Sequence, residues 1–395
     1  MKKLIALVCS LMAIQFFACV QASDTLRPGE TIKIGFIAPM TGDYSGYGIL
    51  PSQAVGLAVD EFNEQGGING FKVQLFVEDS AGNAEKGVKA ANKLIKIDNV
   101  LGIVGDIFSS PSLAIASIAE AEKVVMISPG ATHKDFTNIG KYIFRLIIND
   151  SMQTVVFARY LVTVEKAKTV AILYMNNSYS SGIAMGFREE YEKNGGHIVA
   201  VETAEPGTKN FRDKLRKIKE KQPEILYLPN YVSDTALIVK QAKEIKLDAK
   251  ICSSDAFANL QIFDLLGGLS NGIVFSQKGQ QENKLMKDFV SKVESKLGRT
   301  PDYFSFNSYD AAYVMLNAIK QASSKSRESG SLNIDRDKIR GFISITKDYG
   351  GVSGSITFTA TGDLVGNIGI YVAENRSFKL LKNYRLDGQN LIEFE

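Results

Sequence analysis

Short apolar segments alternate with amphipathic helical segments over residues 31–276. Within residues 31–38, for example, Ile32, Ile34 and Phe36 alternate with more polar or smaller residues, which is typical of a β-strand. Strands of this kind are predicted at 31–38, 71–77, 101–104, 124–127, 142–147, 169–175, 197–202, 224–228, 250–253 and 272–276, with helices between most of them. Sustained β/α alternation of this length indicates an α/β fold with doubly wound parallel sheets.

The pattern changes after residue 276. Two long helices are predicted at 282–297 and 303–322, followed by a polar surface loop at 323–331, a helix at 335–345 and strands at 355–359, 366–373 and 377–384. Helices without strands of their own must pack on a sheet built earlier, so the chain is expected to return to its first domain. At 395 residues the chain exceeds one ordinary core. We therefore predict two lobes, 31–149 plus 277–366 and 150–276 plus 367–395, joined by a three-segment hinge.

The N-terminus has the pattern of a secretory signal peptide at residues 1–22. Lys2 and Lys3 precede an apolar core at 4–20 that is too short for a membrane span. Cleavage after Ala22 is one interpretation, and lipidation of Cys19 is the other. The bulky Phe16 and Phe17 before Cys19 favour plain secretion. The mature chain is expected in the periplasm, either free or held by a lipid anchor.

Charge and motif content exclude several classes of function. The formal net charge of +3 gives no reason to expect a nucleic acid or an anionic membrane as partner. No metal-ligand spacing, nucleophile elbow, Walker loop or dinucleotide fingerprint occurs, so neither a metal, a cofactor nor an enzymatic activity is expected. Cys252 is the only cysteine of the body, and a buried inert thiol is its most economical interpretation.

Polar residues collect where the predicted strands end. The carboxyl ends of parallel strands meet at one edge of a sheet, beside helix N-termini that favour anions. The first domain offers hydroxyls and backbone N–H groups there, and the second offers carboxylates and tyrosines. Facing each other across a cleft, the two sets would complement a zwitterion. The residues are Ser109, Ser110, Gly130, Ala131 and Thr132 in the first domain, and Asp150, Tyr179, Tyr231 and Asp255 in the second.

Each of these residues also has an ordinary structural explanation. Ser109 or Ser110 could cap the helix that follows, and Asp150 could cap the next helix. Tyr179 and Tyr231 could be surface residues of loops. Their joint placement at strand ends is what argues for a binding site.

With these residues collected, the chain resembles the type I periplasmic binding proteins, and among them the leucine/isoleucine/valine-binding proteins of ABC transporters. The resemblance extends over nearly the whole mature chain. Its most specific part is Pro39-Met40-Thr41-Gly42, Gly46-Tyr47-Gly48, Glu64-Gln65-Gly66-Gly67-Ile68-Asn69-Gly70 and Glu78-Asp79. Further matches are Gly105 with Ser109-Ser110, Ile127-Ser128-Pro129-Gly130-Ala131-Thr132, and Gly351 and Gly354 with Phe358, Gly362 and Asp363.

The resemblance implies a solute-binding protein that closes over a branched-chain or similar apolar amino acid and delivers it to a membrane permease. The ligand carboxylate is then assigned to Ser109, the backbone of Gly130 and Thr132, and the ammonium to Asp150 and Asp255. Tyr47, Tyr179 and Tyr231 fall on positions that line the pocket. A monomer without cofactor is expected.

Two departures and three alternatives accompany this assignment. Asp255 stands where the family often has Glu, and Phe108 stands where some members form a disulfide, so Phe108 is expected to narrow or reshape the side-chain pocket. The alternatives are a sensory binding protein, a member that takes an amide, urea or an aromatic acid, and an enzyme on the same scaffold. The absence of catalytic motifs makes the enzyme the weakest of the three.

Overall fold

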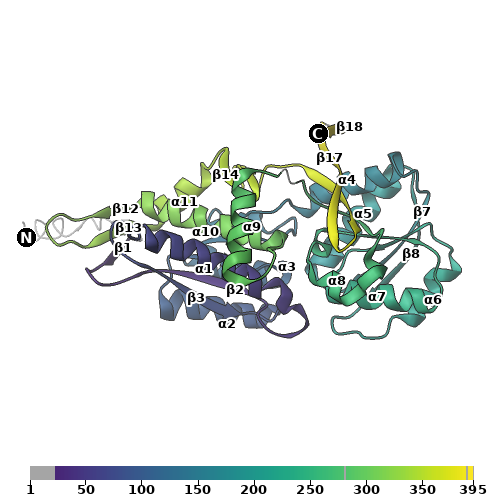
Figure 1. The fold of residues 1–395 in the computed structure, drawn as a ribbon, viewed down its shortest axis with the longest axis horizontal. Helices are drawn as coiled ribbons and strands as arrows, with labels where there is room; N and C mark the ends of the chain where they lie inside the picture. The colour runs from purple at the N-terminus through teal and green to yellow at the C-terminus, as the bar shows by residue number, and fades with distance from the viewer. Residues whose placement is uncertain (1–22, 280–281, 388–389, 395) are drawn as a thin grey trace, which may run out of the picture.

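The computed structural model describes residues 23–279, 282–387 and 390–394 and forms two α/β lobes that lie side by side (Figure 1). The first lobe is built on a sheet of five parallel strands, in the order β3 (Val73–Asp79), β2 (Ile32–Ala38), β4 (Gly102–Gly105), β5 (Val125–Ser128) and β6 (Ile143–Arg145). All five were predicted from the hydrophobic pattern, with ends shifted by a few residues.

The second lobe is built on a larger mixed sheet. Among the described residues its order is β18 (Asn390–Phe394), β17 (Ser377–Asp387), β16 (Ile368–Glu374), β11 (Val274–Lys278), β10 (Lys250–Ser253), β9 (Ile225–Leu228), β7 (Thr169–Met175) and β8 (His197–Ala204). The strands from β11 to β8 run parallel, and the last three strands of the chain add to one edge antiparallel. The predicted α/β class with parallel sheets is confirmed.

Helices cover both faces of each sheet. The first lobe carries α1 (Ile49–Glu64), α2 (Ala84–Lys93), α3 (Ser109–Ala121), α9 (Lys284–Leu297), α10 (Tyr303–Ala322) and α11 (Arg336–Ser344). The second carries α4 (Asp150–Thr163), α5 (Ser178–Lys193), α6 (Arg212–Glu220), α7 (Val232–Glu244) and α8 (Gln261–Leu266). Helix α10 packs against α1 and β4, so the later helices return to the sheet that the chain built first.

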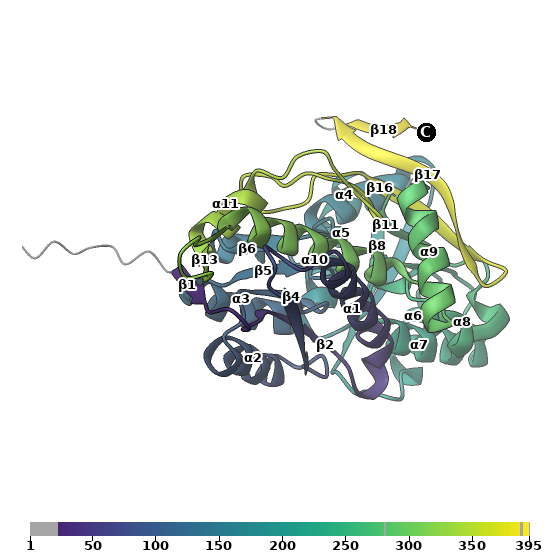
Figure 2. The same ribbon diagram turned by 60° about the vertical axis from the view of Figure 1, so that its left-hand side comes forward.

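The chain passes between the two sheets three times. It crosses after β6, returns after β11, and crosses again on the way to β16, where the yellow C-terminal strands reach the second lobe (Figure 2). The lobe limits stated above and the action of these segments as a hinge stay predictions. Cys252 lies buried at β10, and burial raises the pKa of its thiol to about 12, so this thiol is unreactive.

The loop predicted at 323–331 is wrong in part. Ser323–Lys325 forms β12, which pairs antiparallel with β13 (Leu332–Asp335), and β13 pairs with the N-terminal strand β1 (Ser23–Leu26). Leu332 and Ile334 are fully buried, whereas the residues between the two strands form the polar turn. In β13 only two buried residues alternate with an exposed one, and this pattern is too short to predict a strand unless the pairing with β1 is known.

The C-terminal strands also differ in detail from the prediction. The strands predicted at 366–373 and 377–384 are confirmed as β16 and β17, which form an antiparallel hairpin, and Asn375 and Arg376 at its turn have positive φ angles of 50° and 59°. The strand predicted at 355–359 is shorter, because β15 (Gly354–Ile356) pairs only with β14 (Tyr349–Gly351). The prediction missed β18, which pairs with the far end of β17.

Candidate functional site

The two lobes contact each other through the 3-10 helix η1 (Gly42–Tyr47), which follows β2. The buried Tyr47 hydroxyl donates to the carbonyl of Ala256 at 2.6 Å and accepts from the N–H of Val232 at 3.0 Å. The Tyr44 hydroxyl donates to Asp234 Oδ2 at 2.9 Å. The residues that follow β2 thus reach the strand ends of the second lobe and close over the space between the lobes.

Neither serine at the start of α3 caps that helix. The residue before the helix is Phe108, and no side chain caps the first turn. Ser109 Oγ accepts from the N–H of His133 at 3.3 Å. Ser110 Oγ accepts from the N–H of Ser178 on the other lobe at 3.2 Å. The Ser110 hydroxyl therefore lies at the boundary between the lobes, whereas the buried Ser109 hydroxyl faces the loop after β5 within the first lobe.

Asp150 does not cap α4 either. The cap is Asn149, whose side chain accepts from the N–H of Met152 at 3.0 Å. The N–H of Asp150 donates to the carbonyl of Thr132 at 2.8 Å, which holds the start of α4 against the loop after β5. The Asp150 carboxyl group is thereby left without a role in helix capping.

The loop after β5 carries Gly130, Ala131 and Thr132, all of which are buried. Ser128 Oγ accepts from the N–H of Gly130 at 3.3 Å and of Ala131 at 2.8 Å. These two N–H groups are thus turned toward the protein's own serine. The Thr132 hydroxyl oxygen is buried and makes no hydrogen bond of regular geometry with any described residue.

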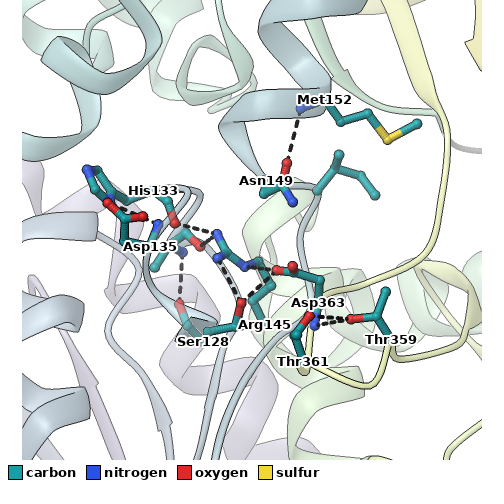
Figure 3. A network of polar contacts seen from close by, with 12 residues as sticks. Ser128, His133, Asp135, Arg145, Asn149, Met152, Thr359, Thr361 and Asp363 are labelled. Carbon is teal, nitrogen blue, oxygen red and sulfur yellow. Dashed lines mark hydrogen bonds and ion pairs between the residues drawn. The ribbon is translucent and has the colours of Figure 1, made fainter. Parts of the chain in front are cut away.

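The same loop is held from behind by Arg145, a fully buried arginine at the end of β6 (Figure 3). Its Nη1 donates to the carbonyls of Ala131 at 3.1 Å and His133 at 2.9 Å. Its Nε lies 2.7 Å from Asp363 Oδ1, in the segment that leads into the last crossing. A single guanidinium therefore ties the candidate binding loop to a segment that connects the lobes.

Two buried carboxyl groups face this loop from the second lobe, and their surroundings differ. Asp255 accepts a hydrogen bond from the Tyr179 hydroxyl at 2.7 Å. Neither oxygen of Asp150 has a hydrogen-bond partner of regular geometry among the described residues. Burial raises the pKa of Asp150 to about 8, with a further increase from the charge of Asp255 that the Thr132 hydroxyl and Arg145 oppose. Burial also raises the pKa of Asp255, to about 6.

Further buried polar groups of this region were missed by the sequence analysis. Gln153 Oε1, Tyr303 Oη and Asn307 Oδ1 are buried without a hydrogen bond of regular geometry in the described part of the chain. The charge of Asp255 contributes to the raised pKa of Tyr303, and Gln153 adjoins Asp255. Gln153 follows Asp150 by one helical turn, and Tyr303 and Asn307 are four apart on one helix face. This helical spacing of polar residues was the sequence signal from which these residues could have been predicted.

Aromatic rings close the other end of the region. Phe108 of the first lobe and Tyr231 of the second are stacked, with ring centroids 3.7 Å apart and planes inclined by 10°. Tyr179 stacks on Tyr231 at 5.0 Å. Tyr44 and Tyr47 each meet Phe108 edge to face, at 5.3 and 5.1 Å. We call Tyr44, Tyr47, Phe108, Tyr179 and Tyr231 the aromatic cluster.

A cleft between the lobes has a volume of about 1020 Å³. Of the predicted site residues, Ser110 and Asp150 line it, together with His133 and residues of α5. A Cβ placed on Gly182 of α5 would lie 3.4 Å from both Asp150 and His133. Because glycine has no side chain, the Asp150 carboxyl is not covered at this position. Tyr47, Tyr179, Tyr231 and Asp255 are buried and do not line this cleft.

Two further features of the described residues concern metal ions and membranes. In that part of the chain no cluster of three or more histidine, cysteine or acidic side chains is arranged to bind a metal ion. Over the same residues, no helix combines the length and the apolar character needed to cross a bilayer.

The lobes, their three connections and the enclosed polar region define a two-lobed ligand-binding protein. The family model described as "Periplasmic binding protein" matches residues 31–376, and the chain belongs to this family. The Leucine-, isoleucine-, valine-, threonine-, and alanine-binding protein of Pseudomonas aeruginosa is 29% identical over 74% of this chain and 79% of its own length.

Solved structures agree with this assignment. A branched-chain amino acid transporter substrate-binding protein from Streptococcus pneumoniae, in complex with isoleucine, has a TM-score of 0.80 at 27% identity, over 92% of this chain and 100% of that chain. A solute-binding protein of an ABC transporter from R. palustris, in complex with benzoate, also reaches 0.80, at 17% identity over 89% and 96% of the two chains. At that identity the second likeness shows the fold alone.

Proposed function

We propose that this chain is the extracytoplasmic solute-binding protein of an ABC importer, and that it binds an amino acid between its lobes and delivers it to a membrane permease. The periplasm is its expected location, since residues 1–22 have the pattern of a signal peptide. This segment and Cys19 lie outside the described residues, so free secretion and lipid anchoring stay open. No enzymatic activity is part of the proposal.

The observation that carries the proposal is the set of buried polar atoms without partners between the lobes. Buried polar groups are nearly always hydrogen-bonded, and each one left unpaired costs about 1–3 kcal/mol. Here the Asp150 carboxyl, the Thr132 hydroxyl and the Gln153 amide oxygen make no hydrogen bond of regular geometry with any described residue, and the one polar neighbour of Asp150 among these groups is the Thr132 hydroxyl, which lowers the pKa of that carboxyl. A ligand that donates to these oxygens removes the cost, and an ammonium group is the strongest such donor.

The opposite end of an amino acid is accommodated by the first lobe. Ser109 stands at the N-terminus of α3, a helix of 13 residues whose dipole favours a negative charge there. The hydroxyls of Ser109 and Thr132 are the donors we assign to the carboxylate. Because one end of the ligand contacts each lobe, binding favours the closed form through contacts that only that form makes.

A thermal-shift screen of the purified protein tests the class of ligand. We expect one or more amino acids to raise the melting temperature by mass action. Amides, urea and benzoate-like acids are included because the R. palustris protein of the same fold is in complex with benzoate. A rise with aromatic acids and none with amino acids would overturn the assignment of Asp150 and Asp255 to an ammonium.

Two variants then test the site by calorimetry. Asp255→Asn removes a charge on the ammonium side and Ser109→Ala removes a hydroxyl on the carboxylate side, and we expect each to weaken binding with the fold intact. Unchanged affinity in both variants would refute this site. A sensory role with the same ligand is the second candidate, and neighbouring genes for a permease and an ATPase, rather than a histidine kinase, would distinguish them.

A further inference from the structure

Phe108 of the first lobe and Tyr231 of the second lobe stack directly on each other and leave no space between their rings. A centroid distance of 3.7 Å with nearly parallel planes is van der Waals contact, so no ligand atom fits between the rings. Phe108 is 2% exposed and Tyr231 is 7% exposed. The two residues form a continuous apolar wall across the cleft rather than the two sides of an open pocket.

Phe108 is also held from behind. A Cβ added to Gly82 would lie 3.0 Å from two carbon atoms of the Phe108 ring, which shows that the ring rests directly on the Gly82 backbone. The edges of Tyr44 and Tyr47 pack on the ring from the same lobe, and their hydroxyls are bonded to the second lobe. The ring therefore cannot withdraw without breaking the contacts that close the lobes.

The polar region beside this wall is the part of the site with unmet hydrogen bonds. Asp150 and Thr132 lie there, and the Tyr179 ring that bonds Asp255 is part of the stack itself. Phe108 directly precedes Ser109, and Tyr179 links Asp255 to the stack, so the wall adjoins both the carboxylate and the ammonium side of the proposed site. We therefore expect the side chain of a ligand held at the polar end to meet the Phe108–Tyr231 wall.

We propose that Phe108 is the specificity-determining residue of this site and restricts it to amino acids with small side chains, of the size of glycine, alanine and serine. This rests on the proposed function and narrows it away from the branched-chain amino acids. Adding methylene groups against a rigid apolar wall forces side chains and backbone apart, whereas a side chain of one or two heavy atoms needs no such movement.

Calorimetry on the full-length mature protein tests this with glycine, alanine, serine, valine, leucine and isoleucine. We expect the best small amino acid to bind at least about tenfold more tightly than leucine or isoleucine, since one methylene alone changes such discrimination by 10-fold or more. In Phe108→Ala the space of the ring becomes available, and we expect the affinity for leucine to rise by about tenfold or more while that for alanine changes little.

Phe62→Ala is the matched control. Phe62 is a buried phenylalanine of the same lobe that packs on Tyr313, outside the aromatic cluster, so its loss lowers stability without changing the order of preference. If Phe108→Ala does not fold, Tyr231→Leu removes the same stack from the second lobe and is expected to shift preference in the same direction.

The outcomes separate this inference from the function on which it rests. Binding of leucine or isoleucine as tightly as alanine by the unaltered protein overturns the size restriction and leaves amino-acid binding in place. An unchanged order of preference in Phe108→Ala and Tyr231→Leu also overturns it. Binding of none of the amino acids, with or without binding of an aromatic acid, overturns both proposals.

Discussion

The two ends of the space between the lobes are built on opposite principles. At the polar end, buried oxygens of Asp150, Thr132 and Gln153 have no regular partner within the described residues. At the aromatic end, Phe108 and Tyr231 are stacked and packed on every side that the structure describes. Favourable contacts with a ligand are therefore available mainly at the polar end. The aromatic end affects binding only by excluding ligands whose side chains are too large.

The two carboxyl groups repeat this contrast within the polar end. Asp255 is already oriented by Tyr179, whose hydroxyl also accepts from the N–H of Ala256 at 3.1 Å. Asp150 makes no hydrogen bond of regular geometry within the described residues, and its nearest polar neighbour is the Thr132 hydroxyl. A carboxyl that is already held in position loses little conformational entropy when a ligand binds. A buried carboxyl without a regular hydrogen bond destabilises the empty protein, and a ligand that donates to it removes that destabilisation. Three predictions test whether this difference is real.

The largest effect is expected for Asp150→Asn. Removing one partner of a buried charge pair costs about 2–5 kcal/mol, so we expect the affinity to fall by about a hundredfold or more. The melting temperature of the empty variant should not decrease, because the substitution removes a carboxyl whose ionisation burial opposes. Calorimetry and thermal unfolding measure the two quantities. Lost stability with unchanged affinity would mean that Asp150 is a structural residue.

The next effect concerns pH. Burial raises the pKa of Asp150 to about 8, so this carboxyl is largely protonated in the empty protein at pH 6. The pKa of Asp255 is raised less, to about 6. An ammonium ligand favours the ionised form, so binding releases a proton and the affinity should fall by about fiftyfold from pH 8 to pH 6. The stability of the empty protein should fall as the pH rises toward 8.

The control for this pH dependence is again Asp150→Asn. The variant retains Asp255, Arg145 and His133, and also Lys134, Glu189 and Glu190 of the same cleft; burial lowers the pKa of His133. We expect the affinity of the variant to be much less sensitive to pH over the same range. An equally steep profile in the variant would assign the titration to Asp255 or His133.

The smallest effect on affinity is expected for Arg145→Lys, which alters the support of the loop after β5. Lysine cannot donate to Ala131, His133 and Asp363 together, so the loop loses its fixed position and we expect the affinity to fall by about tenfold. Arg159→Lys is the matched control, since Arg159 is also buried and pairs with Glu190 in the second lobe. Both variants lose stability. Equal loss of affinity in both would refute the positioning role.

The sequence predicted the fold well because α/β alternation is a strong periodic signal. Every strand of the first sheet and the parallel strands of the second were located from apolar runs such as residues 101–104. The short strands β12 and β13 were missed. They pair with each other locally over only three residues, and β13 also pairs with β1, about three hundred residues earlier in the chain. Strand pairing at such a separation leaves no local pattern in either segment.

The candidate site was predicted less completely. Strand-end position located Ser109, Thr132, Asp150 and Asp255, because parallel strands end at one edge. Position alone did not show that the Ala131 N–H is already bonded to Ser128. Tyr303 and Gln153 were missed because they lie on helices, where a polar residue usually faces solvent. That Phe108 contacts Tyr231 depends on how the lobes close, which no local pattern encodes.

The contacts of η1 also affect how fast a ligand can leave. The bonds from Tyr47 to Ala256 and from Tyr44 to Asp234 are made by the protein itself and enclose the buried polar region. If a solute binds there as proposed, these bonds oppose opening of the lobes, and we expect its residence time to depend on the opening rate of the lobes as well as on its own contacts. A permease that pulls η1 away from the second lobe would shorten that residence time without touching the solute.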